Sequence, residues 1–255
     1  MTLPPLFNCH FPPYIKDCYN NEVDILWYHP NFTQSRYPPG QEISEACTLI
    51  CLLVAARISR ENLLIYDIEN CPKLSIIVAE AIIEGNKIHA WLIKNKLISD
   101  PYLNTEEALK YGNKSLNKLK EWKFNIFHEE IEASLYKNIN IFLHEWYKAP
   151  KAHTLFMLLI TCGRTILFIF QESTYKVMLF DSHSHTTVNS NRGLIIAQTT
   201  IDRLELLCNW YNQDVLKNCY NTKADKYELA FLYFYDAQCS GHNKVSCSCS
   251  KSHKI

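Results

Sequence analysis

The stretch that decides the fold begins at a glutamine and runs into an apolar segment: Gln41-Glu-Ile-Ser-Glu-Ala-Cys47, then Thr48-Leu-Ile-Cys-Leu-Leu-Val-Ala-Ala-Arg57. Ser44 is a candidate N-cap, and residues 46–58 are apolar almost all round, which predicts a helix buried at the centre of a domain. Cys47 then lies at the start of this helix, where the helix N-terminus and a partner imidazole would lower the pKa of its thiol. Gln41 is placed to offer its side-chain amide to a developing oxyanion.

Patterns elsewhere divide the chain into a helical first half and a strand-rich second half. After Pro72, apolar residues recur at three and four positions over 72–94, which predicts a second helix. The polar string 84–89 is expected to hold a helix C-cap at Gly85 or Asn86, with a substrate-facing loop as the alternative. Three apolar runs of strand length between 154 and 180 are joined by short turns, which is typical of an antiparallel meander, and 227–235 predicts a further strand. The expected fold class is therefore α+β.

Composition suggests three segments. Residues 1–40 are rich in Pro and aromatic residues and are expected to be extended with few regular elements. Residues 41–236 form the expected main domain. Residues 237–255 are predicted to be a disordered, Ser- and Lys-rich tail. Its five N/S donors, Cys239, His242, Cys247, Cys249 and His253, leave zinc as the alternative, although Cys247-x-Cys249 is closer than the common zinc spacing. No metal or cofactor is predicted.

Charge and hydropathy exclude several classes of function. Lys+Arg and Asp+Glu both number 26, so there is no electrostatic case for nucleic acid or an anionic membrane as partner. The longest apolar runs have about ten residues, against the roughly 20 that a membrane helix needs. The N-terminus lacks the pattern of a signal peptide, so the 11 cysteines are expected to be reduced thiols and the protein to be cytoplasmic, with the nucleus also open. The oligomeric state is left open.

A second motif, Phe180-Asp-Ser-His183, ends the third apolar run. On a strand, residues i and i+2 project from one face, so Asp181 and His183 are expected to lie side by side. A carboxylate there can hold the imidazole in the tautomer whose free nitrogen faces a thiol. His185 lies one pleat further on and is the alternative base; His183 is preferred because Asp181 precedes it in the paired register. Cys51, one helical turn after Cys47, is expected to be a core residue.

Together these motifs resemble those of papain-like cysteine proteases, in which the nucleophile begins a central helix and the base lies on an antiparallel sheet that faces it. The spacing of Gln41 and Cys47 matches the oxyanion glutamine and nucleophile of that superfamily. The string Phe180-Asp-Ser-His183 resembles the Asp-x-His of the deubiquitinating protease domain in herpesvirus large tegument proteins. The resemblance covers roughly residues 40–58 and 154–197, and it implies that His183 is the base and that Asp181 orients it.

The sequence thus predicts a cysteine peptidase or isopeptidase of the deubiquitinase type, which cleaves after a ubiquitin or ubiquitin-like C-terminus. Cys47 is the expected nucleophile, His183 the base, Asp181 its orienting carboxylate, and Gln41 an oxyanion donor. Ubiquitin as partner rests on the resemblance alone. Two alternatives stay open: a protease-fold binding module without activity, such as a viral factor that binds a host protein, and an acyltransferase or deamidase that uses the same triad.

Overall fold

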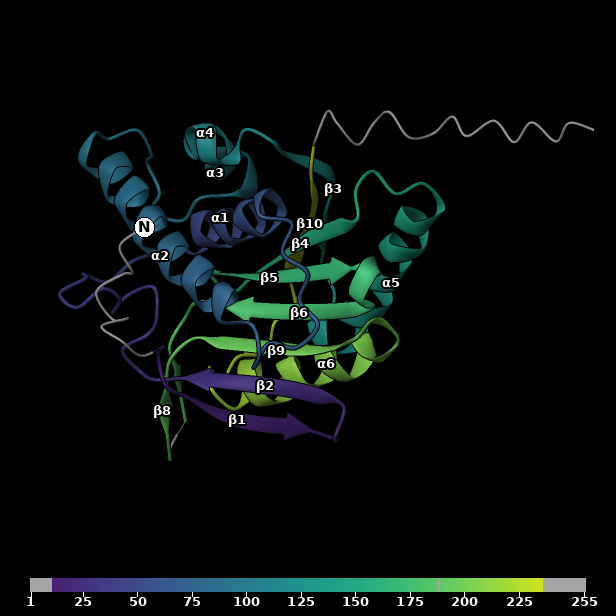
Figure 1. Cartoon of the computed structure of the whole chain (residues 1–255). Coiled ribbons are helices and arrows are strands. Elements are labelled where there is room, and N and C mark those ends of the chain that lie inside the picture. Colours follow the sequence, from purple (N-terminus) through teal and green to yellow (C-terminus); the bar gives the residue numbers. More distant parts are fainter. Residues whose placement is uncertain (1–10, 188, 236–255) are drawn as a thin grey trace, which may run out of the picture.

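An eight-stranded antiparallel sheet runs through the middle of the computed structural model, which describes residues 11–187 and 189–235 (Figure 1). The strand order is β1-β2-β9-β6-β5-β4-β10-β3. A separate two-stranded hairpin pairs β7 with β8. The strands are β1 (Tyr14–Tyr19), β2 (Val23–Tyr28), β3 (Leu119–Phe127), β4 (Thr154–Thr161), β5 (Arg164–Gln171), β6 (Lys176–Asp181), β7 (His185–Thr186), β8 (Asn191–Arg192), β9 (Ile195–Thr200) and β10 (Tyr227–Phe234).

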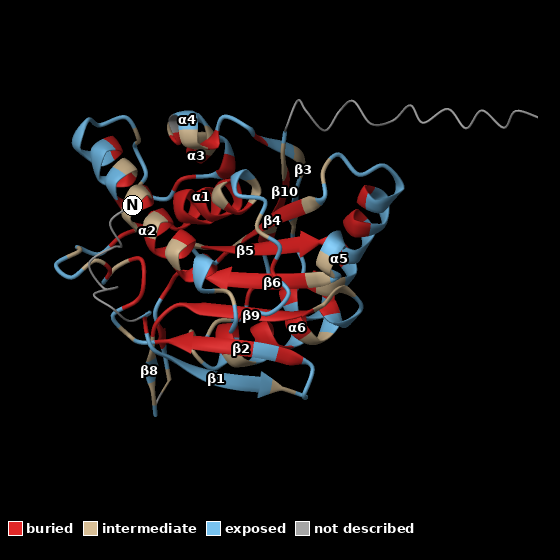
Figure 2. Cartoon of the chain, viewed as in Figure 1, coloured by how far each residue is buried: buried red, intermediate tan, exposed pale blue. Residues whose placement is uncertain are grey.

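Helices cover both faces of the large sheet, and each face has its own apolar core. One face carries α1 (Cys47–Arg60), α2 (Pro72–Lys94), α3 (Thr105–Tyr111) and α4 (Asn113–Leu116); the other carries α5 (Ile131–Lys148), α6 (Leu204–Trp210) and the π-helical turn η4 (Tyr211–Lys217). Short 3₁₀ turns lie at η2 (Glu172–Thr174) and η3 (Ile201–Arg203). Helix α1 lies between the sheet and α2, and 11 of its 14 residues are buried (Figure 2). Contacts with the sheet and with α2 therefore fix the position of this helix.

The expected α+β class, with a helical first half and a central helix packed on an antiparallel sheet, is confirmed. The helix predicted at 46–58 is α1, the one at 72–94 is α2, and the predicted meander is β4, β5 and β6. The expected cap at 84–89 is wrong, because α2 continues through this string. Gly85 allows the close approach of the two helices: a Cβ there would lie 2.6 Å from Cγ1 of Ile50.

The N-terminal segment is more regular than its composition suggested. Strands β1 and β2 form a hairpin, and β2 pairs with β9, so residues 14–28 extend the main sheet. The expectation of few regular elements is therefore wrong here; β2 is mostly buried, whereas β1 is an exposed edge strand (Figure 2). The division of the chain at residues 40 and 236 stays a prediction, and the tail with its possible zinc ligands lies outside the described residues.

Three further observations concern membrane-spanning helices, metal-binding groups and the cysteines. No described helix combines the length and the apolar character that a membrane crossing requires. Across residues 11–187 and 189–235, no group of three or more His, Cys, Asp and Glu side chains converges in a way that would hold a metal ion. All seven described cysteines are free thiols.

Candidate active site

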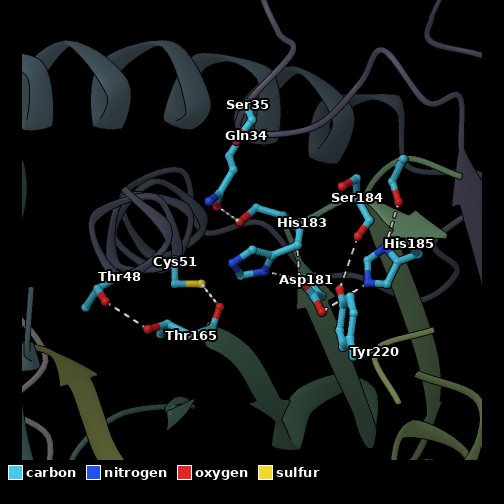
Figure 3. Close-up of polar contacts among 12 residues, drawn as sticks. Gln34, Ser35, Thr48, Cys51, Thr165, Asp181, His183, Ser184, His185 and Tyr220 are labelled. Carbon is cyan, nitrogen blue, oxygen red and sulfur yellow. Dashed lines mark hydrogen bonds and ion pairs between the residues drawn. The ribbon is translucent and has the colours of Figure 1, made fainter. Parts of the chain in front are cut away.

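Cys47 is the first residue of α1, and the first turn of this helix is tied to strand β5. The Thr48 hydroxyl lies 2.8 Å from the hydroxyl of Thr165, and the Cys51 thiol donates to the carbonyl oxygen of Thr165 at 3.4 Å (Figure 3). Ser44 is not the N-cap residue, which is Ala46; instead, the Ser44 hydroxyl accepts the Ala46 N–H at 3.1 Å. The start of the helix is therefore held in place on two sides.

Asp181 and His183 form a close pair just beyond the end of strand β6. Nδ1 of His183 lies 2.6 Å from Oδ1 of Asp181, and the backbone N–H of His183 donates to the same oxygen at 3.0 Å. The sequence had suggested that the two side chains share one face of a strand. Asp181 is instead the last residue of β6, and the pair arises from a turn that the aspartate side chain closes. The other ring nitrogen of His183 points toward α1 (Figure 3).

The same carboxylate also holds His185. Nε2 of His185 lies 3.1 Å from Oδ2 of Asp181, and Nδ1 lies 2.7 Å from the carbonyl oxygen of Gly193. The Tyr211 hydroxyl donates to Oδ2 at 3.3 Å. Figure 3 shows His185 on the side of Asp181 away from α1, whereas His183 lies on the side toward it. The structure thus brings both histidines to Asp181, and the geometry favours His183 as the partner of Cys47.

Asp181, His183 and Cys47 shift one another's pKa values. Burial alone would raise the pKa of the Asp181 carboxyl, but the charges of His183 and His185 and their hydrogen bonds hold it well below its usual range. Burial alone would lower the pKa of His183, but the charge and hydrogen bond of Asp181, together with the interaction with Cys47, raise it to about 9. His183 therefore keeps its proton readily near neutral pH.

The Cys47 thiol behaves differently from its neighbour Cys51. Burial opposes ionisation of Cys47, but the hydrogen bond and charge of His183, followed by hydrogen bonds with Thr165, bring its pKa below the ordinary value. Burial, followed by the charges of Cys47 and Asp181, raises the pKa of Cys51 well above the ordinary value. An imidazolium–thiolate pair is thus favoured at Cys47, and the expectation that Cys51 is a core residue is confirmed by its complete burial.

Gln41 does not point into this cluster. Its side-chain amide donates to the carbonyl oxygen of Glu42 at 3.0 Å, in a partly exposed loop. A different glutamine, Gln34, lies at the site: its Nε2 donates to the Ser44 carbonyl at 2.7 Å, and its Oε1 accepts the Ser182 hydroxyl at 2.6 Å. The Gln34 side chain extends toward the space between α1 and His183 (Figure 3). The sequence analysis missed Gln34, and no spacing signal singles it out.

The loop that carries Gln34 is anchored by the polar string within α2. The Asn86 amide donates to the Gln34 carbonyl at 2.8 Å, and its oxygen accepts the Ser44 hydroxyl at 2.6 Å. The Gln34 backbone N–H donates to the carbonyl oxygen of Ser182 at 2.9 Å. All four side chains are buried, so these hydrogen bonds are shielded from competing water. Asn86 therefore links the Gln34 loop to the chain that leads into Cys47.

Access to the cluster is restricted. Cys47 exposes 4% of its surface and His183 exposes 9%. Little of either side chain is therefore open to solvent in this structure. Tyr102, which is 53% exposed, lies near the start of α1. The charge of Glu45 and, to a smaller extent, that of Cys47 raise the pKa of its phenol.

The chain matches no family model and no curated protein sequence. It is similar in structure to the ubiquitin-specific protease encoded by the tegument protein M48 of murine cytomegalovirus, solved with a ubiquitin-based suicide substrate: identity is 13%, the TM-score is 0.49, and the match covers 81% of this chain and 84% of that one. It is also similar to the Pseudomonas avirulence protein AvrPphB, with 13% identity, a TM-score of 0.38, and coverage of 74% and 94%.

Proposed function

We propose that this protein is a cysteine peptidase or isopeptidase of the deubiquitinase type, with Cys47 as nucleophile, His183 as general base and acid, and Asp181 as the carboxylate that orients His183. The observation that carries the proposal is the buried chain of interactions from Asp181 through His183 to Cys47, which lowers the pKa of the thiol although the thiol is buried. A structural thiol would have no need of such a pair, and burial alone would keep it neutral, as at Cys51.

The reaction follows from these positions. The Cys47 thiolate attacks the carbonyl carbon of the scissile bond, and the electron pair of the C=O bond moves to oxygen. When the tetrahedral intermediate collapses, the amine leaves with the proton of His183, and a thioester remains on Cys47. His183, now neutral, takes a proton from water, whose oxygen attacks the thioester and releases a carboxylic acid and the thiol. Asp181 stays ionised throughout and holds the ring through Nδ1.

The oxyanion of the intermediate needs donors other than the triad. The backbone N–H of Cys47, at the start of α1, is one donor that the helix leaves without an internal partner. For the second donor there are two candidates. Gln41 is the glutamine that the sequence spacing favours, and Gln34 is the one whose amide extends toward the site. An amide nitrogen carries two hydrogens, and Nε2 of Gln34 uses one of them for the Ser44 carbonyl.

The substrate assignment rests on the resemblance of Phe180-Asp-Ser-His183 to the herpesvirus tegument proteases. The restricted access to Cys47 supports it, because the paired glycines at the C-terminus of ubiquitin form a thin chain without side chains.

The test is covalent labelling with ubiquitin that carries a C-terminal propargyl group. We expect the wild-type protein to form one adduct, at Cys47, and the Cys47→Ser variant to form none. Cys162→Ser is the matched control, because Cys162 is an exposed thiol in the turn before β5 and should not react with the probe. Cleavage of a fluorogenic ubiquitin substrate by the same three proteins completes the test.

Two outcomes would contradict the proposal. A folded wild-type protein that binds ubiquitin, or another host protein, without an adduct and without cleavage would be a binding module. Transfer of an acyl group to an added amine, or release of ammonia from a glutamine substrate, with no hydrolysis of ubiquitin conjugates, would instead indicate an acyltransferase or deamidase.

A further inference from the structure

His185 is a second buried imidazole that the proposed reaction does not use. Its side chain is fully buried, and both ring nitrogens face oxygen acceptors: Nδ1 faces the Gly193 carbonyl at 2.7 Å, and Nε2 faces Oδ2 of Asp181 at 3.1 Å. A neutral imidazole has one N–H and can satisfy only one of them. We propose that His185 is a doubly protonated, buried imidazolium that acts as a positioning residue for Asp181; this inference deepens the proposed function and rests on it.

The Gly193 carbonyl cannot turn away from Nδ1 of His185 by a small movement of the backbone. The Gly193 backbone N–H donates to the Tyr28 carbonyl at 2.7 Å, and the next N–H, that of Leu194, donates to the carbonyl of Phe32 at 2.9 Å. A Cβ at Gly193 would overlap the carbonyl oxygen of His29, so the backbone is packed tightly against this segment. The Gly193 carbonyl is thus fixed in place, and it can accept a hydrogen bond but not donate one. The proton on Nδ1 is therefore required.

Nε2 needs a proton as well, because Asp181 is ionised and its neighbours stay neutral. Burial, followed by the charge of Asp181, raises the pKa of Tyr211 and of Tyr220 well above the usual value, and burial raises the pKa of Cys219 to about 11. At neutral pH these groups are uncharged. Within the described part of the chain, Asp181 is the carboxylate that hydrogen-bonds with His185, and a carboxylate oxygen at 3.1 Å accepts a proton but offers none.

Two guanidinium groups lie nearby and oppose a further positive charge. Arg192 lies over the ring of Trp27 at 4.5 Å, and Arg164 lies over the ring of Tyr220 at 3.6 Å. These two rings also flank His185, with centroids at 5.7 and 5.4 Å from its own. Arg192 is also the cross-strand partner of His185 in the β7–β8 hairpin, whereas the Asp181 carboxylate is hydrogen-bonded to the imidazole itself. The direct contact has the larger effect on the imidazole, because Coulomb energy falls with distance.

A charged His185 affects Asp181 because the two histidines bind different oxygens of its carboxylate. His185 and Tyr211 occupy Oδ2, while the ring and the backbone N–H of His183 occupy Oδ1. The plane of the carboxylate is thereby fixed, and Oδ1 is directed at His183. The positive charge of His185 also offsets that of the carboxylate, which limits how strongly Asp181 pulls on the proton of His183. Loss of the His185 charge should therefore raise the pKa of both His183 and Cys47.

The direct test is ¹⁵N NMR of the ring nitrogens in protein labelled at histidine. We expect His185 to show two N–H protons at pH 7, with both ring nitrogens at imidazolium shifts. A single N–H on the His185 ring at that pH would overturn the proposal. This measurement needs neither ubiquitin nor turnover, so a protein that fails to cleave ubiquitin can still show a doubly protonated His185, and the two ideas fail separately.

The functional test compares two variants at the same carboxylate oxygen. His185→Gln removes the positive charge but keeps an N–H donor for Oδ2, whereas Tyr211→Phe removes an uncharged donor and keeps the charge. We expect the midpoint of Cys47 alkylation by iodoacetamide to rise by about one pH unit in His185→Gln and to stay at the wild-type pH in Tyr211→Phe, even if its rate falls. An unchanged midpoint in folded His185→Gln, or equal shifts in both variants, would contradict a role of the charge.

Discussion

The two halves of the candidate site are built in different ways. At the end of β6, Asp181 holds His183 and His185, which lie two and four positions further along the chain. The opposite half is the loop of Gln34, whose contacts reach Asn86, 52 positions away, and Ser182, 148 positions away. The first half is a local turn with charged partners, and the second is a network of neutral hydrogen bonds between distant segments. The charges around Asp181 are thus set by near neighbours in the chain, whereas the shape of the site depends on contacts between distant segments.

The largest expected effect is on the local half. Asp181→Asn should lower kcat for a ubiquitin substrate by about 10⁴-fold, because an amide no longer favours the tautomer of His183 that serves as base. The exposed carboxylate Asp202 offers the control, and Asp202→Asn should retain wild-type turnover. A loss of less than about tenfold in a folded Asp181→Asn protein would mean that the local half does not orient the base.

The next effect decides which glutamine belongs to the distant half. Gln34→Ala should lower kcat by roughly 10²–10³-fold if its amide is the oxyanion donor, and Gln41→Ala should then stay close to wild type. Thermal unfolding of both variants separates this loss from unfolding. If Gln41→Ala carries the loss instead, the loop must rearrange when substrate binds, and the spacing seen in the sequence is the better guide.

The pH profile of kcat/KM reports the pKa values of Cys47 and of His183, the histidine of the local half that faces it. Cleavage requires the thiolate of Cys47 and the proton of His183, so activity should rise through the lowered pKa of Cys47 and fall again near pH 9. Without the Asp181 charge, the pKa of His183 drops, so the alkaline limb of Asp181→Asn should move to lower pH. An alkaline limb that is the same in both proteins would show that Asp181 does not raise the pKa of His183.

The smallest expected effect is a loss of stability when the hydrogen-bond network of the distant half is broken. Asn86→Ala leaves the Gln34 carbonyl and the Ser44 hydroxyl without their partner, which should cost about 2–3 kcal/mol of unfolding free energy in urea. Asn95→Ala, at the exposed end of α2, is the matched control and should cost much less. Turnover should fall with Asn86→Ala, while the pH midpoint of Cys47 alkylation should not change. A shifted midpoint would show that the two halves are coupled.

Much of the fold was predictable because periodicity is a local property. The apolar run after Cys47, the pattern after Pro72 and the meander of β4 to β6 each appear in the structure near the expected residues. The N-terminal hairpin was missed because prolines dominated the interpretation of residues 1–40, whereas burial against β9 decides that 23–28 is a strand. The string at 84–89 was misread because burial and not local polarity decides its role: Asn86 is buried inside α2 and hydrogen-bonds with the Gln34 loop.

By itself, the sequence determined that a cysteine begins a buried helix and that an aspartate stands two residues before a histidine at a strand end. Both statements depend only on neighbours in the chain, so spacing and hydropathy were sufficient. Only the tertiary structure decided that Cys47 meets His183, that Asp181 also holds His185, and that Gln34, not Gln41, points toward the site. These contacts depend on how the sheet and its helices pack, and packing brings together residues whose separation in the sequence carries no information about their distance in space.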